Sequence, residues 1–98
     1  MQICRVKGHI VSTTKTEKME GMKLLLVKPI DLDTFEEKGS LVVAIDTVDA
    51  GEGEIVMTVG GSSSRQTAVT ENRPCDQSII AVIDSIDLEG KRIFEKFS

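Results

Sequence analysis

The sequence predicts an all-β fold, most specifically a small five-stranded barrel of the OB type with a short C-terminal tail. Short runs of Val, Ile and Leu recur along the chain of 98 residues, and turn-forming residues separate them. No stretch shows the period of a long amphipathic helix, so the pattern favours strands with one buried face. A chain of this length suffices for one domain, which we expect to span residues 1–98.

The first predicted strand covers residues 3–12. One parity of this segment is apolar or small: Cys4, Val6, Gly8 and Ile10. The other parity is mainly polar and basic: Ile3, Arg5, Lys7 and His9. Successive side chains of a strand point to opposite faces, so the alternation predicts one face against the core and one in solvent.

The second predicted strand, residues 22–30, forms a hairpin with the first across the charged segment 13–21. Pro29 near its end lacks a backbone donor and is therefore expected to break any further strand pairing. Residues 31–40 carry acidic and turn-forming side chains, which indicates a solvated connection to a third strand at 41–46.

A tight turn at residues 47–53 contains glycines that allow positive φ, and it leads into a fourth strand at 54–59. A loop of small polar residues begins at Gly60. The β-branched run at 78–86 predicts a fifth strand. Residues 92–98 form a tail that either pairs as a final strand or docks elsewhere.

The charge balance excludes several classes of partner. Lys and Arg total 12 and Asp and Glu total 16, which gives a net charge of −4 and a pI near 4.9. Such a surface does not neutralise phosphates or anionic lipids, so we expect no nucleic acid and no membrane as partners. Aromatic residues make up 3% of the chain, too few for a platform on which bases stack.

The cysteine pattern and the absence of a long apolar stretch predict a cytoplasmic protein. Cys4 and Cys75 lie far apart in the sequence. In a reducing compartment we expect both to be small buried thiols rather than a disulfide.

The groups that catalysis requires do not occur together. Serines follow Gly60 and Gly61, but the second glycine of a nucleophile elbow is missing. The single histidine, His9, lies on the polar parity of the first strand and is a poor general base for them. The glycine-rich turns lack the lysine of a phosphate-binding loop, although backbone amides near Arg65 retain the capacity to bind an anion.

Metal binding is also disfavoured. Cys4, Cys75 and His9 lack the close spacing that metal sites show. Pairs of carboxylates lie in or beside turns, where solvated charge is their ordinary role: Asp31 and Asp33, Glu36 and Glu37, Glu52 and Glu54. We therefore predict no enzyme, no metal and no cofactor.

Four segments taken together resemble the EutN/CcmL family. They are residues 23–27 (KLLLV), 43–54 (VAIDTVDAGEGE), 61–66 (GSSSRQ) and 83–84 (ID). Each motif alone is weak, but their order and combination over nearly the whole chain are specific. The sequence departs from the usual family pattern at Asp49, where glycine is more frequent, and at Ser64, where alanine is common.

The resemblance implies an OB-like barrel that forms homo-pentamers at the five-fold vertices of a bacterial microcompartment shell. It implies a structural protein that contacts hexameric shell proteins and is located in that shell, within the cytoplasm. Heterologous contacts between different faces of neighbouring barrels are the kind that close a ring.

Two segments are candidate contact sites in such a ring. Small side chains suit crowding around a five-fold axis, and the proposed axial pore loop consists of Gly60, Gly61, Ser62, Ser63, Ser64 and Arg65. The proposed subunit interface consists of Asp46, Thr47, Val48, Ala50 and Gly51. The first segment is otherwise a surface loop, and the second is otherwise a turn that serves only its own barrel.

A stand-alone OB-like module that binds a small ligand or a peptide is the alternative function. The oligomeric state separates the two, because the shell role requires a ring and the module does not.

Overall fold

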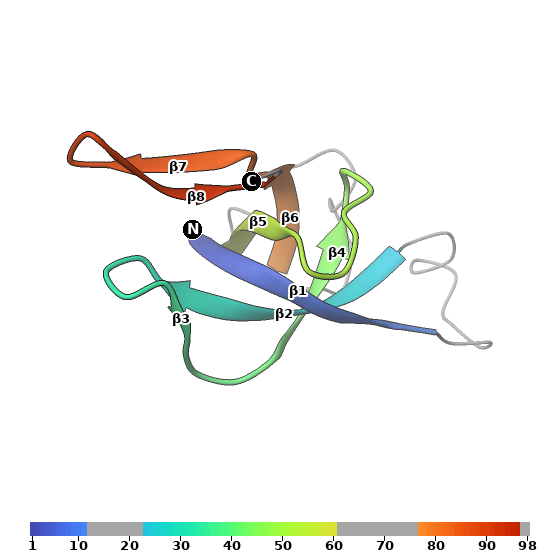
Figure 1. Ribbon diagram of the computed structural model, residues 1–98. Coiled ribbons are helices and arrows are strands. Elements are labelled where there is room, and N and C mark those ends of the chain that lie inside the picture. The colour runs from blue at the N-terminus through green and yellow to red at the C-terminus, as the bar shows by residue number, and fades with distance from the viewer. Residues whose placement is uncertain (12–22, 61–76, 97–98) are drawn as a thin grey trace.

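The computed structural model of the chain describes residues 1–11, 23–60 and 77–96 (Figure 1). Within these ranges it contains no helix and eight strands: β1 (Gln2–Ile10), β2 (Lys23–Asp31), β3 (Glu36–Glu37), β4 (Val42–Asp46), β5 (Ile55–Gly60), β6 (Gln77–Val82), β7 (Ser85–Leu88) and β8 (Lys91–Glu95). The described part of the chain therefore holds no helix with the length and apolarity needed to cross a membrane.

Five strands close into a barrel. They follow the order β1, β5, β6, β4 and β2, and β2 returns to pair with β1. β4 and β6 are parallel, whereas the other neighbours around the barrel are antiparallel. The short β3 extends the edge of β2 within the segment expected to be a solvated connection. β2 continues through Pro29, which lies opposite Cys4 and whose carbonyl accepts a hydrogen bond from the Lys38 amide at 2.9 Å, so the prediction that Pro29 breaks the pairing is wrong. The prediction of an all-β fold with a five-stranded barrel is confirmed.

The barrel interior is aliphatic, as the low aromatic content requires. Alternate positions of its strands, with one residue from the turn after β4, supply one packed cluster, whose buried members are Cys4, Val6, Leu25, Val27, Ala44, Ala50, Val56 and Ile79. Removing a large side chain from such a core costs about 2–5 kcal/mol of folding free energy. Cys4 is a free thiol, 1% exposed, and burial raises its pKa, so it is the inert thiol that the sequence predicts. Cys75 lies outside the described residues.

β1 does not keep one buried face along its whole length. Its register against β2 shifts between Val6 and Gly8, and such a bulge turns the following side chains to the opposite face. Ile10 therefore lies opposite Leu24 and packs with Leu24 and Ile45 in a second apolar cluster, apart from the one that holds Val6. The prediction that Ile10 shares a buried face with Val6 is wrong for this reason.

The predicted fifth strand at residues 78–86 is in fact divided between two sheets. β6 ends at Val82, and the Ile83 amide donates the last bond to the Ile55 carbonyl at 2.8 Å. The chain then leaves the barrel, and β7 pairs with β8 in a separate two-stranded sheet. Of the two alternatives for the C-terminal tail, pairing as a final strand is the one observed.

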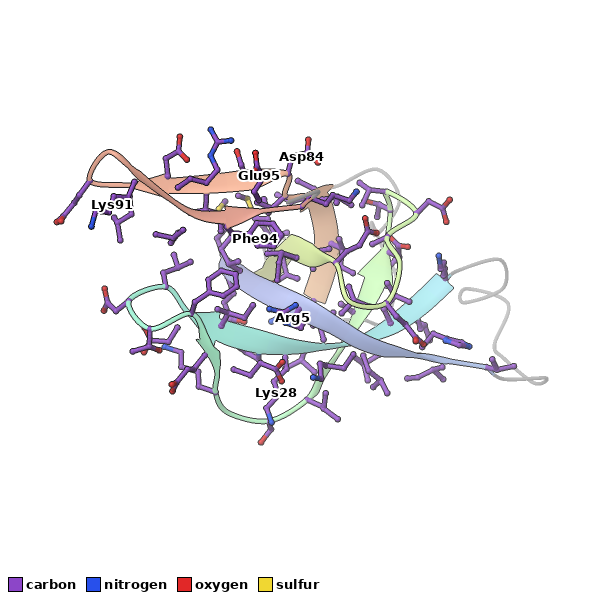
Figure 2. All side chains as sticks on the ribbon, viewed as in Figure 1. Arg5, Lys28, Asp84, Lys91, Phe94 and Glu95 are labelled. Atoms are coloured by element: carbon purple, nitrogen blue, oxygen red, sulfur yellow. The ribbon has the colours of Figure 1, made fainter. Side chains whose placement is uncertain are left out.

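The β7–β8 hairpin lies beside the barrel, with its turn pointing away from it (Figure 1). Phe94 points from β8 toward the barrel (Figure 2) and stacks on Phe35, with ring centroids 5.6 Å apart and planes 19° apart. At its base, the Lys96 amide donates to the Asp84 carbonyl at 2.8 Å. A two-stranded hairpin alone is marginally stable, so these contacts hold it in place.

Candidate functional site

The turn that follows β4 is organised by the carboxylate of Asp46. This side chain is fully buried and accepts hydrogen bonds from the amides of Val48 at 3.0 Å and Ala50 at 2.8 Å. Hydrogen bonds to a charged acceptor are stronger than neutral ones, so one side chain fixes both backbone groups of the turn.

Lys23, at the start of β2, ties the same turn to the barrel. Its ammonium donates to Asp49 Oδ1 at 3.0 Å and to the Ala50 carbonyl at 3.1 Å, and it lies 3.4 Å from Asp46 Oδ2. The hydrogen bond to Asp49, supported by the one to Asp46, raises the pKa of Lys23 above its ordinary value. The lysine therefore stays charged and links the end of β4 at Asp46 to Asp49 and Ala50 in the turn.

Asp49 has a backbone conformation that is uncommon for residues other than glycine. Its φ is +59°, in the left-handed region that glycine adopts without cost and that aspartate tolerates. Gly53 is the second residue of the turn with positive φ, at +87°. The turn thus retains with aspartate the conformation that glycine favours.

Glu54 links the turn to the C-terminal hairpin. Its carboxylate accepts a hydrogen bond from the Gly51 amide and forms an ion pair with Lys96 at 2.6 Å. The Lys96 ammonium, followed by the Gly51 amide, lowers the pKa of Glu54 below its ordinary value. A Cβ at Gly51 would lie 3.4 Å from Glu54 Oε1, at the edge of ordinary van der Waals contact, so the bond from the amide does not by itself require glycine.

The structure places the five predicted interface residues within one turn, but commits most of them to their own chain. Asp46 and Ala50 are buried, and Thr47 Oγ1 donates to the Ile79 carbonyl at 2.6 Å. Val48, by contrast, is 37% exposed. The turn therefore serves its own barrel, and a contact between copies stays a prediction.

The predicted axial pore loop falls largely outside the described residues. Gly60 ends β5 and lies opposite Gln77 at the start of β6. Gly61, Ser62, Ser63, Ser64 and Arg65 lie beyond the described ranges. Their axial role stays a prediction.

The outer face of the barrel carries charged residues whose arrangement the sequence does not reveal. Glu37 lies 3.5 Å from the Arg5 guanidinium and 3.0 Å from the Lys7 ammonium. The hydrogen bond from Lys7 is the main cause that lowers the pKa of Glu37. His9 approaches Glu52 at 3.1 Å in solvent. Within the described ranges, no group of three or more His, Cys, Asp or Glu residues could hold a metal ion.

A family profile described as ethanolamine utilisation protein EutN/carboxysome matches residues 1–84. The chain belongs to the EutN/CcmL family. Its relatives include the carboxysome shell vertex protein CcmL of Nostoc sp., 40% identical over 98% of this chain and 95% of that one. The bacterial microcompartment shell vertex protein EutN of Salmonella typhimurium is 38% identical over 98% of this chain and 96% of that one.

Solved EutN/CcmL structures share the whole fold. CcmL from Gloeobacter violaceus superposes with a TM-score of 0.91 at 38% identity, covering 100% of both chains. The GrpN pentameric microcompartment shell protein from Rhodospirillum rubrum superposes with a TM-score of 0.78 at 36% identity, covering 90% of this chain and 99% of that one. Both the family resemblance and the OB-like barrel predicted from the sequence are confirmed.

Proposed function

We propose that copies of this chain close into a homo-pentamer that caps the five-fold vertices of a bacterial microcompartment shell. The observation that carries the proposal is the full-length match to proteins named as shell vertex proteins, at 38–40% identity over 98% of the chain. The same assignment follows from the motifs of the sequence, so the predicted role as a vertex protein is confirmed at the level of the family.

Two structural relatives support the pentamer. GrpN from Rhodospirillum rubrum is described as pentameric, and so is a shell protein of the RMM microcompartment that superposes with a TM-score of 0.70 at 28% identity. A ring of this kind joins one face of each barrel to a different face of the next. The stable product of this association is a closed pentameric cap. The chain therefore acts by assembly rather than by catalysis.

The partners beyond the ring follow from the geometry of a closed shell. Flat six-fold tiles cannot enclose a volume, so the pentamer meets hexameric shell proteins at each corner. The complex lies in the shell, within the cytoplasm. In the ring, the segment from Gly60 to Arg65 lines the five-fold axis, and Val48 with its turn approaches the neighbouring copy.

Native mass spectrometry and light scattering of the purified chain test the pentamer. The expected species has five times the 10.7 kDa mass of one chain at micromolar concentration. A monomer at high micromolar concentration contradicts the proposal and favours the stand-alone binding module. Co-expression with hexameric shell proteins then tests the vertex role, because shells made without this chain are expected to lack mass at their corners in electron micrographs.

A further inference from the structure

One continuous outer surface of the barrel carries an apolar groove next to a cluster of positive charges. On β1, Ile3 and Arg5 are two positions apart, so their side chains point to the same side of the sheet. Arg5 lies opposite Lys28 on β2, and Ile3 lies opposite Met57 on β5. Residues paired across strands also share a side, so the groove and the charges belong to a single surface, which we call the outer surface.

The groove forms the apolar half of the outer surface. It has a volume of about 490 Å³ and opens to solvent, and its apolar lining consists of Met1, Ile3, Pro29, Ile30, Leu32 and Met57. Met1 and Leu32 are 82% and 44% exposed. Exposed apolar side chains that cluster mark interaction surfaces more often than isolated ones do.

The other half of the outer surface is a cluster of three cations around one carboxylate. Lys7 Nζ and Arg5 Nε approach the same atom, Glu37 Oε2, at 3.0 Å and 3.5 Å. The hydrogen bond from Lys7 and the charges of Lys7, Arg5 and Lys28 lower the pKa of Glu37. Lys28 points away from the barrel (Figure 2), and its ammonium forms no ion pair with any described residue. The cluster is therefore locally positive, although the chain as a whole carries a net charge of −4.

The sheet does not need this concentration of positive charge for its own stability. Arg5 and Lys28 lie directly opposite each other, and like charges in that position destabilise a strand pair. Lys7 lies at the bulge between Val6 and Gly8, and a bulge changes the direction of a side chain. Departures from the local rules of stability occur most often at functional sites, and here both departures supply cations that an additional anion would stabilise.

The far end of the groove carries the opposite charge. Asp31 lies 3.9 Å from the Lys38 ammonium and also accepts a hydrogen bond from the Asp33 amide at 2.9 Å. The Asp33 carboxylate itself forms no ion pair within the described ranges. The outer surface thus runs from a negative end at Asp33, through the apolar groove, to the positive cluster.

We propose that the outer surface docks an extended segment of a partner protein in which large apolar side chains are followed by carboxylates. The apolar side chains lie in the groove, and the carboxylates reach Arg5, Lys7 and Lys28. The reverse placement brings the carboxylates against Asp33, and this repulsion fixes the orientation. A protein segment fits better than a nucleic acid, because the carboxylates of Asp31 and Asp33 repel a continuous phosphate backbone. The inference goes beyond the proposed function, which requires no such segment.

Peptide binding to the purified protein provides the test. The probe is the peptide Leu-Ser-Trp-Ser-Glu-Ser-Glu with blocked ends, whose apolar and acidic side chains share one side when it is extended. The chain itself has no Trp and no Tyr, so the fluorescence of the probe reports binding without a label. We expect a blue shift that saturates with a Kd below about 1 mM. The same peptide with glutamine in place of both glutamates is expected to bind about tenfold more weakly.

Two pairs of variants locate the binding. Lys28→Glu is expected to weaken binding of the probe about tenfold, whereas Lys91→Glu, which changes the net charge equally at the turn of the β7–β8 hairpin (Figure 2), is expected to stay within about twofold of the wild type. Leu32→Ser is expected to weaken binding about fivefold. Its control is Leu88→Ser on β7, where the leucine is 46% exposed, and binding is expected to change less than about twofold.

Several results overturn the inference. They are a probe that does not bind, a glutamine peptide that binds as tightly as the probe, and a control variant that loses as much affinity as its partner. Displacement of the probe by an equal concentration of inorganic phosphate or of a single-stranded oligonucleotide indicates a general anion site and also overturns it.

Native mass spectrometry of the same samples separates this inference from the proposed function. We expect the probe to bind without changing the number of chains in the assembly. A probe that dissociates the assembly shows that the outer surface is a contact between copies, which overturns the inference and leaves the pentamer standing. A wild-type chain that forms no pentamer overturns the proposed function, while binding of the probe to that chain still supports the docking surface.

Discussion

Replacing Asp46 by alanine tests the internal role of the turn after β4. The substitution removes the acceptor of two backbone hydrogen bonds, at 3.0 Å and 2.8 Å, and leaves the amide of the buried Ala50 without a partner. A hydrogen bond to a charged group contributes about 1.5–3 kcal/mol. Burying the Asp46 carboxylate also carries a desolvation cost, and the alanine variant no longer has this cost, which offsets part of the loss. We expect the free energy of unfolding to fall by about 3 kcal/mol.

Asp49→Asn is the matched control for Asp46→Ala. Both aspartates contact the Lys23 ammonium, but the side chain of Asp49 is 94% exposed. Asparagine also tolerates the left-handed backbone found there. Loss of an exposed ion pair costs about 0.2–1 kcal/mol, so the difference between the variants isolates the two turn hydrogen bonds.

Urea unfolding at one fixed protomer concentration provides the measurement, because the stability of an oligomer depends on concentration. An Asp46→Ala variant no less stable than Asp49→Asn refutes the internal role of the carboxylate. A variant that keeps its unfolding midpoint but loses the pentamer in a native mass spectrum shows that Asp46 acts between copies instead.

Three further variants test other parts of the molecule. Lys96 holds the pKa of Glu54 below its ordinary value of 4.5, so the stabilisation from this pair is present above about pH 4.5 and is lost as the pH falls through the lowered pKa. Glu54→Gln should therefore cost about 1 kcal/mol at pH 7 and little at pH 3, and urea midpoints that differ equally at both pH values contradict this. Phe94→Ala removes the stack on Phe35 and should speed hydrogen exchange of the amides of β7 and β8 about tenfold while the barrel amides are unchanged; uniform protection disproves the anchoring role. Ser63→Trp should weaken the pentamer or block its central opening, whereas an unchanged mass and an unchanged axial opening in electron micrographs count against the axial loop.

Strand positions were predictable from the sequence because each barrel strand carries its own alternating or β-branched pattern. The division of residues 78–86 was not, since the run is continuous in strand propensity and the departure from the barrel depends on the distant Ile55 carbonyl. The bulge in β1 had a local signal in Gly8, because glycine inside a strand often marks a bulge.

The candidate site was predictable only in part. The hydrogen bonds that Asp46 accepts from the amides two and four residues later are local, and an aspartate at the start of a turn commonly accepts such bonds. The partners Lys23 and Lys96 come from distant segments, so only the closed barrel brings them to the turn. Likewise, the outward position of Val43 opposite Leu26 depends on the register of β4 against β2, which no local pattern fixes.

The parallel pair of β4 and β6 has a consequence for synthesis on the ribosome. β6 fills the gap between β4 and β5, so both of those strands keep a bare backbone edge until residues 77–82 have emerged. Bare edges are templates for pairing with other chains. Translation products that stop before residue 77 are therefore expected to aggregate, whereas products that stop after residue 83 already contain every strand of the closed ring.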